Sequence, residues 1–197
     1  MFAELRAAMR PTFVLLAFFT ALTGLAYPLL ITAIAQATMP AAANGSLIRQ
    51  NGHVIGSALI GQTFTQARYF HARPSAAGKS GYDASSSTGS NLAPGAKALA
   101  DRITGDVGAL RQAGVSGPIP ADLVTASGSG LDPDITPQAA LVQVPRIARA
   151  RGIDPAKLRQ MIAAATTPPV LGVIGAAHLN VLQINRQLDT NGRMIAP

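Results

Sequence analysis

The stretch that decides the fold lies near the N-terminus and reads Thr12-Phe13-Val14-Leu15-Leu16-Ala17-Phe18-Phe19-Thr20-Ala21-Leu22-Thr23-Gly24-Leu25-Ala26-Tyr27-Pro28-Leu29-Leu30-Ile31-Thr32-Ala33-Ile34. It carries no charged side chain, and a helix needs about 20 consecutive apolar residues to cross a hydrocarbon core. We therefore predict that residues 11–36 form one transmembrane helix. Pro11 suits the first helical turn, where its missing N–H costs nothing. Pro28 is expected to kink the span, because it removes one backbone hydrogen bond.

Basic residues predict the orientation of this helix. Arg6 and Arg10 precede it, whereas the next basic residue is Arg49. The positive-inside rule then puts residues 1–10 in the cytoplasm and residues 37–197 outside the membrane. The alternative is a cleaved signal peptide, since Ala35-Gln36-Ala37 has the small-x-small pattern of a cleavage site. The apolar run exceeds the length of a usual signal-peptide core, about 7–15 residues, which favours a retained anchor.

One side of the predicted span is small and weakly polar. Thr20, Gly24 and Tyr27 share a face by three-and-four spacing, and small residues let helices approach closely in lipid. This face is either a packing surface for another helix or the ordinary Gly and Thr content of a spanning helix.

Composition restricts the function classes. The chain has no cysteine, which excludes disulfides, thiolate metal sites and a cysteine nucleophile. Its 16 basic and 9 acidic residues give a net charge of +7. A basic cluster comprises Arg146, Arg149, Arg151, Lys157 and Arg159. No aromatic residues are interleaved with it, so nucleic-acid binding is not expected. A solvated face is favoured, with an acidic partner or lipid headgroups as the alternative.

Beyond the anchor, the pattern predicts a small α+β soluble domain. Asn51-Gly52 lies between the runs 46–50 and 53–60, which indicates a β-hairpin because both turn residues need φ > 0. Residues 64–93 show no periodicity, and a loop this long is usually functional or disordered. Its aromatic residues, among them Tyr69 and Tyr82, favour an ordered and packed loop.

Helices and one further strand complete the predicted domain. A helix is expected from Pro94 to Gly114, with an apolar stripe of Leu99, Ile103, Val107 and Leu110. Further helix starts are Thr136-Pro137, with Pro145 interrupting that helix, Asp154-Pro155, and a cap at Asn180. The apolar run Val170–Ile174 is predicted to be a strand.

Two glycine-containing loops are candidates for phosphate binding. Gly78-Lys79-Ser80 resembles the end of a P-loop, but Arg73 occupies the position of its first glycine, which argues against that motif. The segment Ser127, Gly128, Ser129, Gly130 could cradle a phosphate with backbone N–H groups. A tight loop before a helix is its simpler interpretation.

Metal and acid–base chemistry have little support. His53, His71 and His178 lack the spacing of metal ligands, so no metal is expected. Asp132 and Asp134 flank Pro133 and could meet a cation, although Asp at such positions usually caps a turn. The residues alone predict no catalytic machinery and no directly bound cofactor.

The whole pattern nevertheless resembles a known family. The matching segments are Arg10-Pro11, 22–29, 44–48, 56–62, 69–76, 82–84, 89–92, 122–133, 143–148 and 180–182. In this order they resemble KdpC, the C subunit of the bacterial potassium-transporting P-type ATPase. Ser86-Ser87-Thr88 stands where the family tends to be richer in Gly.

The resemblance implies a non-catalytic accessory subunit in the inner membrane. Its implied partners are a potassium-selecting channel-like subunit, an ATP-hydrolysing P-type subunit and a small additional membrane subunit, so the complex handles ATP and potassium. Two roles are proposed for the family: capping the channel-like subunit outside, and raising the ATP affinity of the pump subunit. The outside topology favours capping; with an inverted topology, Ser127, Gly128, Ser129, Gly130 and Asp132 would be the nucleotide candidates. A stand-alone anchored binding or enzymatic domain is the alternative.

Segments that match the family supply the candidate interface residues. In the anchor these are Thr20, Gly24, Tyr27 and Pro28, and in the long loop they are Tyr69, Phe70, Arg73, Tyr82, Asp83 and Asn91.

Overall fold

A computed structural model describes residues 2–193 of the chain, with side chains up to Thr190. It divides into two compact units, one ending at Leu47 and the other beginning at Ile48. The predicted fold class, one N-terminal apolar helix followed by a small α+β domain, is confirmed.

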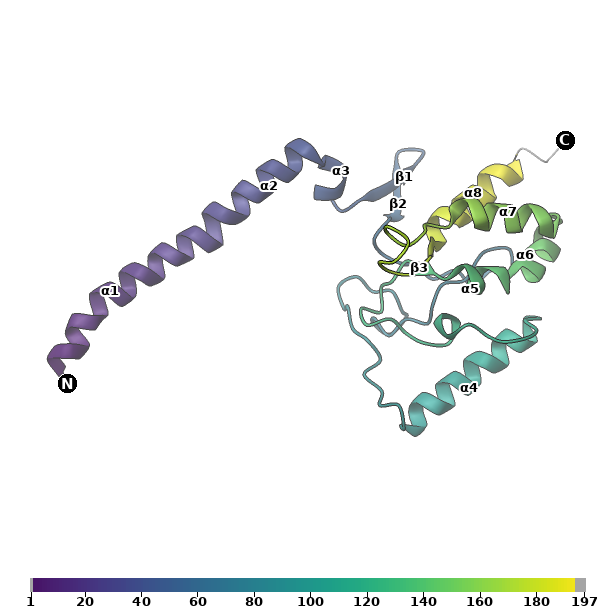
Figure 1. Cartoon of the computed structure of the whole chain (residues 1–197), viewed down its shortest axis with the longest axis horizontal. Coiled ribbons are helices and arrows are strands. Elements are labelled where there is room, and N and C mark those ends of the chain that lie inside the picture. The colour runs from purple at the N-terminus through teal and green to yellow at the C-terminus, as the bar shows by residue number, and fades with distance from the viewer. Residues whose placement is uncertain (1, 194–197) are drawn as a thin grey trace. The chain divides into compact units, whose positions relative to one another are not determined.

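The first unit is dominated by one long helix (Figure 1). It comprises α1 (Phe2–Ala21), the π-helical turn η1 (Leu22–Ala26) and α2 (Tyr27–Thr38), and the short α3 (Pro40–Ala43) follows. Phe2–Thr38 is long and apolar enough to cross a membrane. Its start differs from the prediction, because Pro11 lies inside α1 rather than in its first turn. Proline is tolerated there at the loss of one backbone hydrogen bond.

Pro28 is accommodated by a local change of helix type. The amide of Tyr27 donates to Leu22 O, five residues back, in place of the four-residue α spacing. Such π turns are rare and occur mostly as single turns inside α-helices. Pro28 itself falls in the first turn of α2, where its missing N–H is tolerated.

The second unit carries two small antiparallel sheets. In the first, β1 (Leu47–Gln50) and β2 (His53–Ser57) are joined by Asn51 and Gly52, whose φ angles are 50° and 81°. This confirms the predicted hairpin. In the second, β3 (Asp134–Ile135) pairs with β4 (Leu179–Asn180), a pairing between segments far apart in sequence that no local pattern indicates.

The rest of the second unit is largely helical. The helices are α4 (Lys97–Gln112), the 3₁₀ turn η2 (Ala121–Leu123), α5 (Pro137–Leu141), α6 (Val144–Arg151), α7 (Pro155–Ala165) and α8 (Val181–Arg193). The predicted caps are present: Thr136 accepts from the amide of Ala139, and Asp154 accepts from that of Ala156. The side chain of Asn180 accepts from the amide of Gln183. Each cap satisfies a backbone donor that the helix itself cannot pair.

The hydrophobic core lies between α5, α6, α7, α8 and the long loop. Its fully buried large side chains include Phe70, Ile135, Ile147, Leu158, Leu179, Ile184 and Leu188. By contrast, no residue of α4 is fully buried, so the predicted stripe from Leu99 to Leu110 is only half-covered. Figure 1 shows α4 standing at the edge of this unit, between two long connections.

The predicted strand at Val170–Ile174 is wrong. These residues form a tight turn in which Leu171 and Gly172 have φ angles of 54° and 77°. A strand requires negative φ throughout. Val170 and Ile174 form an isolated antiparallel bridge with each other, and the apolar side chains of the turn are exposed to solvent.

Candidate functional site

Two buried amides fasten the long loop to the core. Asn185 of α8 accepts from the amide of Phe70 at 2.8 Å and donates to Phe70 O at 2.9 Å. Gln143 does the same to His71, at 2.8 and 3.1 Å. Each side chain thus replaces a neighbouring strand and satisfies backbone groups inside the protein. The predicted packing of this loop is therefore confirmed.

Part of the basic cluster is structural. Arg151 pairs with Asp189 at 2.8 Å, and the Tyr69 hydroxyl donates to the same carboxylate at 2.9 Å. The Arg151 guanidinium also lies 4.9 Å from the centre of the Tyr69 ring, a cation–π contact. Arg149, Lys157 and Arg159 are exposed, as a solvated face requires. The cluster is therefore only partly the solvated face that was predicted.

Arg146 crosses beneath the start of the long loop. It donates to Ala67 O at 2.6 Å and to the Gln143 side chain at 2.6 Å, and lies 3.2 Å from Nε2 of His71. Burial lowers the pKa of Arg146 to about 10. Burial and the positive charge of Arg146 together lower the pKa of His71, which favours its neutral form.

A junction forms where the long loop meets the Ser127–Asp132 loop. Arg73 Nη1 pairs with Asp132 Oδ2 at 2.8 Å, and both side chains are partly exposed. Ser75 Oγ donates to Gly130 O at 2.6 Å and accepts from the amides of Ala77 and Tyr82, at 3.1 and 2.8 Å. A single hydroxyl thus ties three segments together.

Tyr82 closes the junction. Its hydroxyl donates to Arg73 O at 2.8 Å, and its backbone takes a φ of 55°, a left-handed conformation unusual for an aromatic residue. Burial, followed by the negative charge of Asp132, raises the pKa of Tyr82 to about 12. Tyr82 therefore stays a neutral donor at any physiological pH.

Glycines allow the close approach of chains at this junction. A Cβ on Gly61 would collide with the Tyr82 ring and lie 2.6 Å from Asp132 O. A Cβ on Gly130, whose φ is +67°, would collide with Thr88 O and lie 2.8 Å from the amide of Ala77. Only glycine fits at either point.

In the candidate phosphate loop Ser127–Asp132, two backbone N–H groups already donate hydrogen bonds within the loop. The amide of Gly130 donates to Ser127 O at 3.3 Å, and that of Leu131 donates to Ser129 Oγ at 3.1 Å. A phosphate cradle needs several convergent, unpaired N–H groups. Nucleotide binding by Ser127–Asp132 stays a prediction, with these two amides already engaged.

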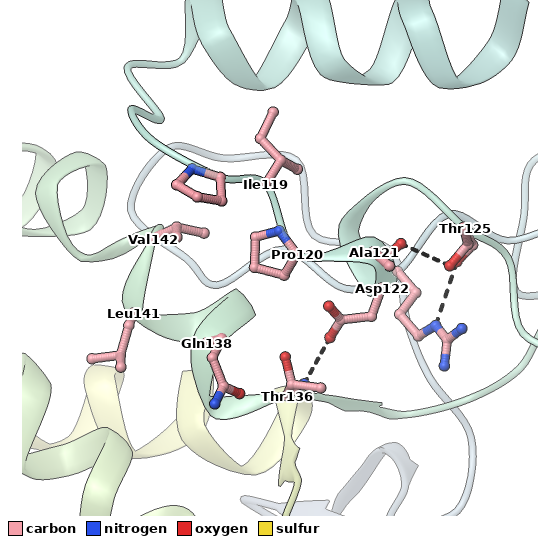
Figure 2. Close-up of a pocket in the computed structure, with 11 residues that line it drawn as sticks. Ile119, Pro120, Ala121, Asp122, Thr125, Thr136, Gln138, Leu141 and Val142 are labelled. Carbon is pink, nitrogen blue, oxygen red and sulfur yellow. Dashed lines mark hydrogen bonds between the residues drawn. The ribbon is translucent and has the colours of Figure 1, made fainter. Parts of the chain in front are cut away.

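A cavity of about 760 Å³ adjoins the junction. It is lined by Arg73, Pro118, Ile119, Pro120, Ala121, Asp122, Thr125, Thr136, Gln138, Leu141 and Val142. Figure 2 shows the apolar side chains of Ile119 and Val142 above and to the left of Pro120, with the polar side chains of Asp122 and Thr136 below it. Asp122 Oδ2 accepts from the amide of Thr136 at 2.7 Å, whereas its buried Oδ1 has no hydrogen-bond partner among the described residues.

The structure brings together only some of the residues singled out from sequence. Arg73, Tyr82, Gly130 and Asp132 meet at the junction, and Tyr69 and Phe70 anchor the loop that reaches it. Asp83 and Asn91 are exposed loop residues, and Asn91 has a φ of 50°. The anchor residues Thr20, Gly24, Tyr27 and Pro28 belong to the other unit.

Sequence reasoning missed several residues that build the site. Ser75, Asp122, Gln143 and Asn185 all make contacts between segments distant in sequence. The available signal is the polar residue on an otherwise apolar helix face, as Asn185 is between Ile184 and Leu188.

Comparison with known proteins decides the family. The KdpC family of K⁺-transporting ATPase c chains matches residues 9–190. The chain belongs to the KdpC family. A potassium-transporting ATPase KdpC subunit of Methylorubrum populi is 50% identical over 196 residues, covering 94% of this chain and 98% of the relative.

Two further KdpC relatives agree with this assignment. The Gemmatimonas aurantiaca subunit is 54% identical over 183 residues, covering 92% of each chain. The Caulobacter vibrioides subunit is 53% identical over 182 residues, again covering 92% of each. KdpC membership implies an accessory role in potassium transport as one subunit of an ATPase complex, which agrees with the single candidate membrane helix.

Proposed function

We propose that this chain is a non-catalytic subunit that holds a potassium-transporting ATPase together and caps its potassium-selecting subunit on the outer side of the inner membrane. The observation that carries the proposal is the joining of one membrane-length helix to a KdpC domain. Residues 1–10 are cytoplasmic, 11–36 cross the membrane and 37–197 lie outside. The partners are the channel-like subunit, the ATP-hydrolysing subunit and a small membrane subunit.

The charge pattern supports this topology. Arg6 and Arg10 lie at the start of the long helix, and no charged residue follows until Arg49. Lys and Arg flanking a first helix stay on the cytoplasmic side. A domain outside the membrane cannot reach ATP, so any rise in the ATP affinity of the pump subunit is transmitted through the anchor.

The junction around Arg73 supports a docking role rather than catalysis. Its ionisable groups are engaged, since Arg73 pairs with Asp132 and the Tyr82 hydroxyl donates to a backbone carbonyl. Burial keeps the Tyr82 hydroxyl protonated. Such an arrangement fixes the shape of a surface, and leaves neither a base nor a nucleophile poised for reaction.

Cysteine labelling tests the topology, because the chain has no native cysteine. Ser80, an exposed residue of the long loop, is changed to Cys, and Ala3→Cys near the N-terminus is the matched control. In intact spheroplasts an impermeant thiol reagent should label S80C and leave A3C unlabelled until lysis. The reverse pattern would contradict capping and revive the nucleotide role of Ser127–Asp132.

Purification from native membranes tests the assembly. The tagged chain should retain the other ATPase subunits in mild detergent. Recovery of the chain alone, with its domain folded, would favour the stand-alone binding or enzymatic domain. N-terminal sequencing of the same material checks the anchor, since a start at Thr38 would mean that the helix is a cleaved signal peptide.

A further inference from the structure

The turn that replaces the predicted strand displays four aliphatic side chains. We call Val170, Leu171, Val173 and Ile174 the aliphatic tip; their exposed fractions are 64%, 87%, 82% and 60%. Single exposed apolar residues are ordinary on protein surfaces, but a contiguous group marks an interaction site.

The aliphatic tip is held rigidly. The amides of Val170 and Ile174 each donate to the carbonyl of the other at 2.9 Å. Below them, Thr167 and His178 exchange backbone hydrogen bonds of 2.8 and 3.1 Å, and His178 leads directly into the buried Leu179 of β4. A loop already fixed in one shape loses little conformational entropy on binding.

The backbone at Leu171 takes an unfavourable conformation that places the leucine side chain in solvent. Leu171 takes a φ of 54°, a region where Gly or Asn is normally found. Adjacent Gly172, with a φ of 77°, shows that the turn needs two such residues. A leucine at the outermost position therefore costs stability and contributes no burial, which points to a role outside this chain.

The chemistry of the tip selects its partner. No charged residue occurs between Arg159 and His178, and no aromatic residue follows Tyr82. Trp and Tyr are enriched where proteins meet the membrane–water interface, and interfacial amphipathic helices carry Lys or Arg beside their apolar residues. An uncharged, purely aliphatic tip fits instead an uncharged pocket in another protein, and a KdpC chain has partner subunits.

We propose that the aliphatic tip inserts into an apolar pocket on the outer surface of a membrane-embedded subunit of the same ATPase. This rests on the proposed function, and adds to it a specific contact. Leu171 and Val173 are its anchors, because they are the most exposed members. The contact is apolar, so its strength changes little with salt.

One substitution separates folding from docking. Leu171→Gly removes the side chain while suiting the left-handed backbone, so the melting temperature of the full chain should stay the same or rise. Partner subunits retained by the tagged variant after extended washing should fall about five- to tenfold relative to wild type. Leu59→Ala is the matched control, an exposed aliphatic residue outside the tip, and should retain the partners fully. Equal retention by Leu171→Gly and wild type, or equal loss from Leu59→Ala, would overturn the proposal.

Photo-crosslinking identifies the occupant. With p-benzoylphenylalanine replacing Val173 in the full complex, irradiation of membranes should give an adduct with a membrane-embedded subunit. An adduct only with lipid, only with a second copy of this chain, or with nothing would overturn the tip contact. If the wild-type chain still retains the other subunits in that case, the proposed function stands; if it retains none, that function fails first.

Discussion

Asn185 is expected to hold a large share of the domain's stability. Asn185→Ala removes the two hydrogen bonds, of 2.8 and 2.9 Å, that satisfy the amide and carbonyl of the fully buried Phe70. Each backbone group left unpaired costs about 1–3 kcal/mol. The two groups together therefore cost about 2–6 kcal/mol, and we take a value in the lower half of that range, about 3 kcal/mol.

Urea unfolding of the full chain in detergent measures this loss. The chain has no Trp, so Tyr fluorescence is followed in a Tyr27→Phe background, where Tyr69 and Tyr82 report on the domain. For a slope of about 1.5 kcal/mol/M, the midpoint should fall by about 2 M. Gln183→Ala, at an exposed position of the same helix, should shift it by less than about 0.5 M. A shift this small in Asn185→Ala would refute the view that the amide fastens the loop.

Two further predictions concern the junction and the loop beneath it. Gly61→Ala places a Cβ 2.6 Å from Asp132 O and should destabilise the domain by about 1–3 kcal/mol. Gly105→Ala, with open space around it in α4, should instead stabilise the domain by about 0.5–1 kcal/mol. Thermal unfolding compares the two variants, and an unchanged stability of Gly61→Ala would disprove close packing at this position. The folded state lowers the pKa of His71 from 6.5, so the unfolded chain takes up its proton first and stability falls as the pH drops through about 6.5. Titrating the unfolding free energy of wild type and His71→Gln from about pH 8 to 5.5 should show a shrinking difference, and parallel curves would contradict this.

Features coded locally were predictable from the sequence. Asn51-Gly52 specifies its own turn, and the caps at Thr136, Asp154 and Asn180 act on amides only two or three residues away. The long apolar helix Phe2–Thr38 needs no partner in the chain to be recognised as a candidate membrane span, since length and composition suffice for that. Each of these signals lies within one short window.

Features that depend on distant segments were not predictable. The β3–β4 pairing and the Asn185 and Gln143 contacts join parts of the chain that are far apart in sequence. The Val170–Ile174 run misled for a related reason: a short apolar run has the same composition whether it is buried or displayed. The left-handed φ at Leu171 makes this run an exposed turn rather than a buried strand. Leucine is not a residue type that predicts a positive φ. Of the junction, Arg73, Tyr82, Gly130 and Asp132 were identified from the sequence, whereas Ser75 and the meeting of these segments were not.

The π turn at Leu22–Ala26 divides the long helix into two halves, and it rotates the side chains of one half about the helix axis relative to those of the other. Hydrogen bonding across five residues, as between Tyr27 and Leu22, puts roughly one extra residue into the turn. Thr20, Gly24 and Tyr27 therefore do not share one helix face as three-and-four spacing predicts. The two halves of the helix can contact different neighbouring helices. Pro28 has no N–H and so cannot donate to a carbonyl one turn before it; within a bilayer, carbonyls freed in this way are satisfied by neighbouring helices, side chains or waters. Such a helix presents different faces to its surroundings before and after the π turn.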